Sequence, residues 1–133
     1  ALLWAPNFSI GMHLFGRLVE YAAKLVEEAN AGFDAHLVET HHAQKIDAPS
    51  GTARALAERA ERASGRPMPV TSVRVGSVPG THQVIFDGAF EQIRLEHTAR
   101  DRRVFATGAL TAARWLAGRR GVFTLDHLLG TSE

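Results

Sequence analysis

The residues best suited to chemistry crowd into one stretch, Glu39 to Ala53, which reads ETHHAQKIDAPSGTA. His41, His42 and Lys45 can all donate or accept protons, and histidine side chains titrate near neutral pH. Lys45 follows His41 by four residues, so a compact loop would bring both side chains into one pocket. The stretch therefore predicts a loop that transfers protons. A solvated His/Lys surface pair is the alternative reading of the same residues.

The second half of this stretch predicts an anion site. Ser50-Gly51-Thr52 runs into an alanine-rich segment with helical spacing, so Ser50 is a candidate helix cap. The backbone N–H groups of Gly51 and Thr52 would then be free to bind a carboxylate or a phosphate. An ordinary helix start without a ligand is the alternative.

Alternating patterns predict the elements that position this stretch. Helices are expected over 10–30, where Ser9 is the cap, over 52–63, and from Asp101 to Leu116 with Phe105, Ala109, Ala112, Ala113 and Leu116 inward. A short strand over 35–39 delivers the loop. Three period-two segments, 70–77, 82–86 and 90–96, with turns between them, predict an antiparallel meander. His82 begins one of these strands, where a half-buried structural histidine is as good a reading as a functional one.

These elements define an α+β domain that covers 1–133. We expect a mixed, mostly antiparallel sheet with helices on one face and an open face used for oligomerisation. The first residues read as the end of a buried strand of a longer protein. The apolar tail over 121–130 is expected to dock on another domain or subunit.

Composition narrows the function classes. The 133 residues are 45% hydrophobic and 22% charged with a formal net charge of +1, which is too balanced to indicate nucleic acid, despite several arginines near the C-terminus. No apolar run is long enough to suggest a membrane span. The absence of cysteine fits a reducing compartment, so a cytoplasmic location is expected.

The Glu39–Ala53 stretch resembles the signature of the dihydrodipicolinate reductase family, enzymes of lysine and diaminopimelate biosynthesis. The likeness continues in Ala5-Pro6-Asn7-Phe8-Ser9-Ile10-Gly11, in Val78-Pro79-Gly80-Thr81-His82, in Phe105 to Leu110 and in Trp115-Leu116. Family members have an N-terminal Rossmann domain, which binds NADH or NADPH, and a C-terminal domain, which binds substrate and forms a homotetramer. The chain has no Gly-x-Gly-x-x-Gly after a strand, so it resembles the C-terminal domain alone.

The resemblance implies roles for particular residues. His41 would be the catalytic proton donor or acceptor and Lys45 a catalytic proton donor, and the nicotinamide end of the cofactor would meet the segment Ala5, Pro6, Asn7 and Phe8. Substrate, a small cyclic dicarboxylate, would be bound by His42, Ser50, Gly51, Thr52 and Arg102. For Arg102, part of an Arg-Asp-Arg-Arg run, a surface charge role is nearly as good a reading. Glu39 and Asp47 are expected either to orient His41 or Lys45, or merely to set the strand register and cap a turn.

Two other function classes remain open. His36, His41, His42 and Asp47 lie close in sequence and are of types that bind zinc, although their spacing matches no common zinc motif. A metal hydrolase is therefore a minor alternative, and no metal site is predicted. The stronger alternative is a non-enzymatic oligomerisation module that is inactive without its dinucleotide-binding domain.

Overall fold

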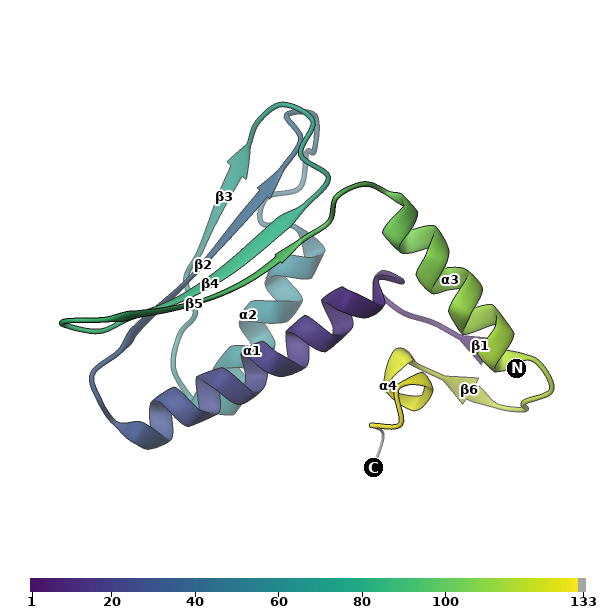
Figure 1. Ribbon diagram of the computed structural model, residues 1–133, viewed down its shortest axis with the longest axis horizontal. Coiled ribbons are helices and arrows are strands. Elements are labelled where there is room, and N and C mark those ends of the chain that lie inside the picture. Colours follow the sequence, from purple (N-terminus) through teal and green to yellow (C-terminus); the bar gives the residue numbers. More distant parts are fainter. Residues whose placement is uncertain (132–133) are drawn as a thin grey trace.

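The computed structural model describes residues 1–131 and shows ten elements (Figure 1). In chain order they are β1 (Leu2–Leu3), α1 (Ile10–Ala29), β2 (Asp34–His41), α2 (Gly51–Ser64), β3 (Val70–Arg74), β4 (Thr81–Asp87), β5 (Gln92–Thr98), α3 (Arg103–Leu116), β6 (Val122–Phe123) and α4 (Leu125–Leu128). The three long helices fall where the sequence pattern predicts them.

The main sheet has the strand order β3-β2-β4-β5, and this order corrects the predicted meander. Only β4 and β5 are an antiparallel hairpin of the predicted kind; β3 pairs with β2 and runs parallel to it. The reason is α2, which connects β2 to β3 as a crossover, so β3 lies beside β2 in the same direction. The other edge of β2 pairs with β4, antiparallel. The predicted α+β class with a mixed, mostly antiparallel sheet is confirmed.

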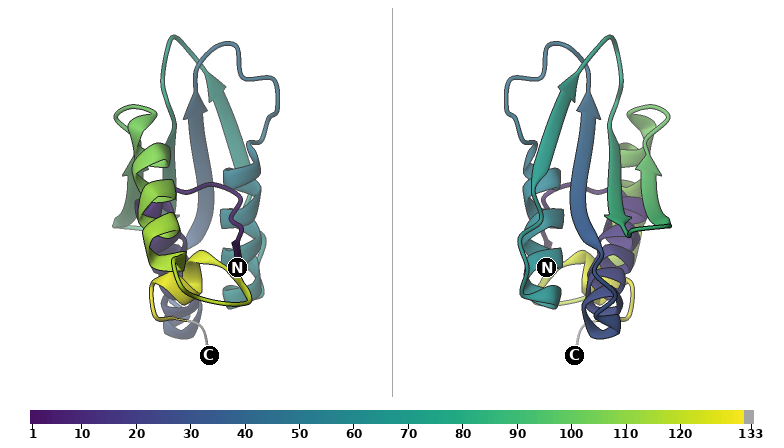
Figure 2. Two further views of the ribbon diagram at one scale, coloured as in Figure 1. Left: turned by 90° about the vertical axis from the view of Figure 1, so that its right-hand side faces the viewer. Right: turned by 90° about the vertical axis from the view of Figure 1, so that its left-hand side faces the viewer.

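α1 and α2 cover one face of this sheet, and the opposite face is open (Figures 1 and 2). The core lies between them and includes Phe15 and Val19 from α1, Leu56 from α2, and Leu37 and Phe86 from the sheet. Because side chains alternate along a strand, the residues that follow Leu37 on its face are Glu39 and His41. The chemistry therefore lies on the helix-covered face, at the end of β2.

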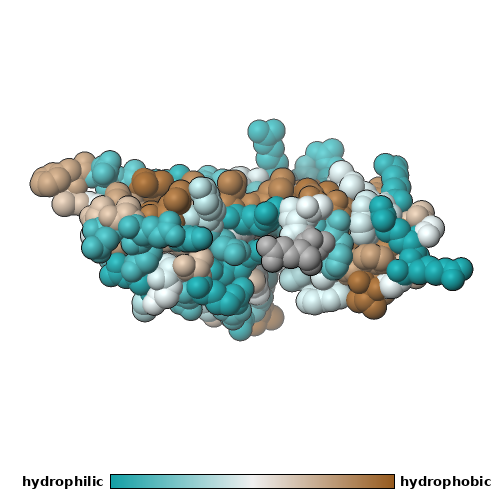
Figure 3. Space-filling model, turned by 90° about the horizontal axis from the view of Figure 1, so that it is seen from below, coloured by the Kyte–Doolittle hydropathy of each residue, from teal (hydrophilic) through white to brown (hydrophobic). Residues whose placement is uncertain are grey.

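The buried stripe of α1 contains only some of its large apolar residues. Its buried positions include Met12, Phe15, Val19 and Ala23, whereas other apolar side chains are about half exposed: Leu14, Leu18, Tyr21 and Leu25. Helical spacing alone is consistent with burial of either set of residues. Contact with α2 and the sheet determines which set is buried. Figure 3, which looks at the molecule from below, shows hydrophobic side chains along one long edge and hydrophilic ones over much of the remaining surface.

The predicted helix caps differ in how closely they match the structure. The Ser9 hydroxyl accepts a hydrogen bond from the N–H of Met12 (3.1 Å), which confirms it as the cap of α1. At α3 the residue before the helix is Arg102, and Asp101 caps from one position further out by accepting from the N–H of Arg103 (2.8 Å). Ala113 is exposed, contrary to prediction.

The C-terminal tail contacts the start of this chain and α1, and its docking on another domain or subunit stays a prediction. β6 pairs in parallel with β1, Leu2 opposite Val122 and Leu3 opposite Phe123. Leu125 of α4 is buried, and Asp126 lies 2.8 Å from Nε2 of His13 on α1. The tail thus links the two ends of the domain through contacts that sequence periodicity does not encode.

Among residues 1–131, no helix is both long and apolar enough to cross a membrane.

Candidate active site

A cleft of about 630 Å³ opens where β2 ends and α2 begins. It gathers residues that are far apart in sequence, because the 76–79 loop and the first turn of α3 complete its walls. The predicted site residues that line it are Pro6, Asn7, His41, His42, Lys45, Ser50, Gly51, Thr52 and Arg102. Ala5 and Phe8 are not among the lining residues. A hollow of about 820 Å³ beside α1 and α4 contains none of the predicted site residues.

His41 is the last residue of β2, not a loop residue, and it is 9% exposed. Its Nδ1 is hydrogen-bonded to Oε2 of Glu39. An ionised carboxylate can only accept, so Nδ1 is the donor in this pair and Nε2 is left for other chemistry. The strand fixes the position of the ring, and Glu39 fixes its orientation.

Glu39 is fully buried and makes four polar contacts. Oε1 accepts from the N–H of Ser50 (3.1 Å) and from Nη2 of Arg74 (2.8 Å), and Oε2 accepts from Nη1 of Arg74 (3.0 Å) as well as from His41. Burial raises the pKa of Glu39, but hydrogen bonds outweigh burial and lower the pKa to about 2. Glu39 is therefore an anion at physiological pH, and it ties together the end of β2 and the start of α2. Of the two roles considered for Glu39 from sequence, the geometry favours orienting His41.

Lys45 lies in the loop that follows β2, and its Nζ is 2.9 Å from Oδ1 of Asp47. The hydrogen bond from Lys45 is the main reason that the pKa of the Asp47 carboxyl is lowered. The lysine side chain is three-quarters buried, whereas Asp47 is half exposed. The pair holds the ammonium group at the rim of the cleft.

The start of α2 has the geometry of an anion site. Ser50 caps the helix, its hydroxyl accepting from the N–H of Ala53 (3.1 Å). N–H groups in the first turn have no partner within the helix, so that of Thr52 is available at the cleft, while that of Gly51 also approaches the Asp47 carboxyl and helps to lower its pKa. Nδ2 of Asn7 donates to the Thr52 hydroxyl (3.3 Å), which ties the segment before α1 to this helix start.

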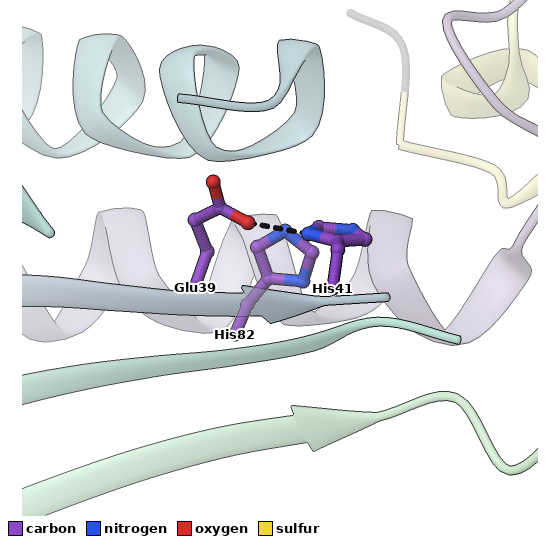
Figure 4. A group of neighbouring side chains, drawn as sticks. All are labelled: Glu39, His41 and His82. Atoms are coloured by element: carbon purple, nitrogen blue, oxygen red, sulfur yellow. Dashed lines mark hydrogen bonds and ion pairs between the residues drawn. The ribbon is translucent and has the colours of Figure 1, made fainter. Parts of the chain in front are cut away.

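His82, on β4 opposite Glu39 in the strand register, lies beneath these groups (Figure 4). Its ring meets the His41 ring edge-on with centroids 5.3 Å apart, and its Nε2 is 3.5 Å from the Ser50 hydroxyl. Burial, reinforced by the charge on His41, lowers the pKa of His82 to about 4. His82 is therefore neutral at physiological pH and supports the ring of His41 from below.

The buried trio of Glu39, His41 and His82 brings three possible metal-ligand atoms within 4.8 Å of one another. The trio fits a cation poorly, because both oxygens of Glu39 already accept hydrogen bonds from the guanidinium of Arg74. The cluster suggested by sequence is not assembled: His36 faces the open side of the sheet and bonds the Thr71 hydroxyl (2.7 Å).

Sequence reasoning missed Arg74. It is the last residue of β3, and its side chain reaches Glu39 only because β3 lies parallel to β2, with Arg74 opposite His41 in the register. A predicted meander placed this strand elsewhere. A helix between β2 and β3 is a crossover connection, which predicts that β3 pairs in parallel with β2. That pairing would have placed Arg74 beside the end of β2.

Known proteins resemble this chain over nearly its whole length. A family model described as dihydrodipicolinate reductase, C-terminus, matches residues 11–129. Proteins named 4-hydroxy-tetrahydrodipicolinate reductase are 49% identical in Stenotrophomonas maltophilia strain K279a, over 96% of this chain and 52% of that protein, and 35% identical in Methanosarcina mazei, over 95% and 52%.

A solved structure has the same fold. It is described as dipicolinate-bound dihydrodipicolinate reductase from Paenisporosarcina sp. TG-14, with a TM-score of 0.64 and 26% identity over 92% of this chain and 52% of that one. The chain belongs to the family of dihydrodipicolinate reductase C-terminal domains. It spans about half the length of the curated relatives that it matches.

Proposed function

We propose that this chain is the substrate-binding domain of an NAD(P)H-dependent reductase that converts 4-hydroxy-tetrahydrodipicolinate to tetrahydrodipicolinate. The observation that carries the proposal is the cleft in which His41 and Lys45 face the start of α2. Named relatives that are 35–49% identical over the aligned half of their length support the same reaction.

The substrate is a small ring with two carboxylates, and the cleft offers groups for both. The N–H groups of Gly51 and Thr52, with the positive end of the α2 dipole, suit one carboxylate. His42 and Arg102 also line the cleft and provide hydrogen-bond donors for the other. The solved relative whose description names bound dipicolinate, a planar pyridine dicarboxylate, is consistent with this ligand class.

His41 and Lys45 supply the protons. The C4 hydroxyl group of the substrate leaves as water, a hydride adds to C4 of the dehydrated ring, and the electron pair displaced in the ring must then be protonated. With Nδ1 held by Glu39, protonated His41 donates from Nε2. Lys45 balances the negative charge of the substrate and is a second proton donor.

The dinucleotide supplies the hydride and would be bound mostly by an N-terminal Rossmann domain outside this chain. Within the chain, Pro6 and Asn7 line the cleft beside Thr52, so they fit a planar ring placed against the substrate. Phe8 packs instead against α3, where its carbonyl oxygen approaches Gly108.

We further assign the open face of the sheet to a homotetramer and the parent enzyme to the cytoplasm. The open face carries mixed polar and β-branched side chains, among them Val38, Thr40, Val73 and Ile85, which suits contact with another copy. Sedimentation of the chain tests the assembly; a monomer at micromolar concentration would contradict it.

Calorimetric titration of the chain with pyridine-2,6-dicarboxylate tests the binding site. We expect one site per chain, and about tenfold weaker binding or worse in Thr52→Val and His42→Ala, since each removes a polar group at the cleft. Thr107→Val, exposed on α3 and outside the cleft, is the matched control. Absence of binding by the unaltered chain, or unchanged binding in both cleft variants, would contradict the proposed site.

The alternative, a module that is inactive alone, concerns this chain and not the whole enzyme. Without a dinucleotide-binding domain, hydride transfer has no source, so the chain mixed with substrate and NADPH should show no oxidation of the cofactor at 340 nm. Measurable turnover would show that the 133 residues suffice.

A further inference from the structure

Arg74 connects the carboxylate that holds His41 with the loop that carries Lys45, although it does not line the cleft. A guanidinium has five N–H donors, and here each one has an acceptor. Nη1 donates to Glu39 Oε2 (3.0 Å) and to the Val73 carbonyl (3.0 Å). Nη2 donates to Glu39 Oε1 (2.8 Å) and to the Asp47 carbonyl (2.6 Å), and Nε donates to the Lys45 carbonyl (3.3 Å).

With all five donors used, Arg74 has none left for a ligand, so its role is to hold other groups in place. Two donors fix the carboxylate of Glu39, which in turn holds Nδ1 of His41 and the N–H of Ser50. Two more hold the carbonyls at either side of Ile46 in the loop that carries Lys45. The Ile46 side chain itself is 98% exposed, so apolar packing does not hold this part of the loop.

We propose that Arg74 is a positioning residue that fixes the position of the His41 ring relative to the Lys45 loop. The proposal rests on the proposed function for what His41 and Lys45 do. A single planar cation holds the strand end and the loop together, so the two proton donors keep a fixed separation. Lysine cannot replace it, because an ammonium group has three donors and no flat fork.

The proposal predicts a loss of turnover that exceeds the loss of binding. In the complete enzyme, Arg74→Lys and Arg74→Met should each lower kcat by about 100-fold, the cost of misplacing catalytic groups by roughly 1 Å. The dissociation constant for pyridine-2,6-dicarboxylate should change by less than about threefold, because the first-turn N–H groups of α2 remain. Arg66→Lys, which alters an exposed Arg–Glu pair at 3.3 Å, is the matched control.

A double-variant cycle separates positioning from general stability. If Arg74 acts largely through Glu39, then Glu39→Gln combined with Arg74→Met should cost less in kcat than the product of the two single losses. The double variant also removes both buried charges, so it keeps the measurement possible if either single variant fails to fold. Melting curves identify a temperature at which every variant is folded.

Three results would overturn the proposal: full kcat in Arg74→Lys, losses in the double variant that multiply, or dicarboxylate binding that falls as far as kcat. None of these bears on the proposed function itself, which is tested in the same assay by His41→Gln. Unchanged turnover in His41→Gln would contradict the catalytic role of His41, whatever Arg74 does.

Discussion

Gly80 lies against the ring of His41: a Cβ atom at Gly80 would be 3.1 Å from His41 Nε2 and 3.4 Å from its Cδ2. The backbone of Gly80 also has φ of 154°, in the region that favours glycine. The N–H of Ala99 donates to the Gly80 carbonyl (2.9 Å), so this segment is anchored and cannot easily retreat. A glycine therefore provides the space in which the proposed proton donor sits.

Gly80→Ala should lower kcat by at least tenfold and destabilise the fold by about 1–3 kcal/mol. The new methyl group would push against the His41 ring, and alanine would be strained at this backbone φ. Enzyme kinetics and urea denaturation measure the two effects. Gly65→Ala is the matched control: it also has a positive φ, 71°, but nothing lies within 4 Å of its added Cβ. The control should lose stability and keep kcat, and equal kcat losses in both variants would contradict the assigned contact.

The depressed pKa of Glu39 makes stability depend on pH in the acid range. Its folded-state pKa of about 2 lies below the usual 4.5, so its contribution is fully present above pH 4.5 and is lost as the pH falls toward 2. The loss amounts to about 3 kcal/mol. Urea unfolding from pH 5 to pH 2 measures it, and Glu39→Gln combined with Arg74→Met should flatten that part of the curve.

Protonation of His82 should lower the stability of the fold in a higher pH range than protonation of Glu39. Its pKa falls from 6.5 to about 4 on folding, so its contribution is present above pH 6.5 and is lost as the pH falls toward 4. Between pH 7 and pH 4 the protein should lose about 3 kcal/mol. NMR of the ring carbons should show His82 still neutral at pH 5.5; a charged ring at that pH would contradict its burial.

Gly108 marks the close approach of α3 to the segment that precedes α1. An added Cβ would lie 1.6 Å from the carbonyl oxygen of Phe8, so one of the two backbones must move. Gly108→Ala should destabilise the fold by about 3 kcal/mol or more and weaken dicarboxylate binding, because Asn7, next to Phe8, and Arg102, just before α3, both line the cleft. Thr107→Ala, one residue away and exposed, is the control, with an expected change within about 0.5 kcal/mol. Equal stability of the two variants would contradict the packing.

The sequence by itself determined the local features of this protein. Ser9 precedes an apolar pattern with helical spacing, Ser50 precedes a second one, and period-two alternation marks β4 and β5, since such signals depend only on neighbours along the chain. The Glu39–Ala53 stretch likewise keeps most of its proton donors and anion-binding groups within fifteen residues, so its chemistry was visible without a fold.

Tertiary structure decided which strands pair and which helix face is buried, because residue spacing along the chain fits more than one arrangement. Whether β3 joins β4 or β2 depends on the path of α2, and that choice brings Arg74 to Glu39. Which apolar stripe of α1 is buried depends on the surfaces that the helix contacts. The pairing of β6 in the tail with β1 likewise joins the two ends of the chain. The proposed proton donors could be identified from the sequence, but the contacts that hold them in place join strands far apart in the chain, and only folding brings those strands together.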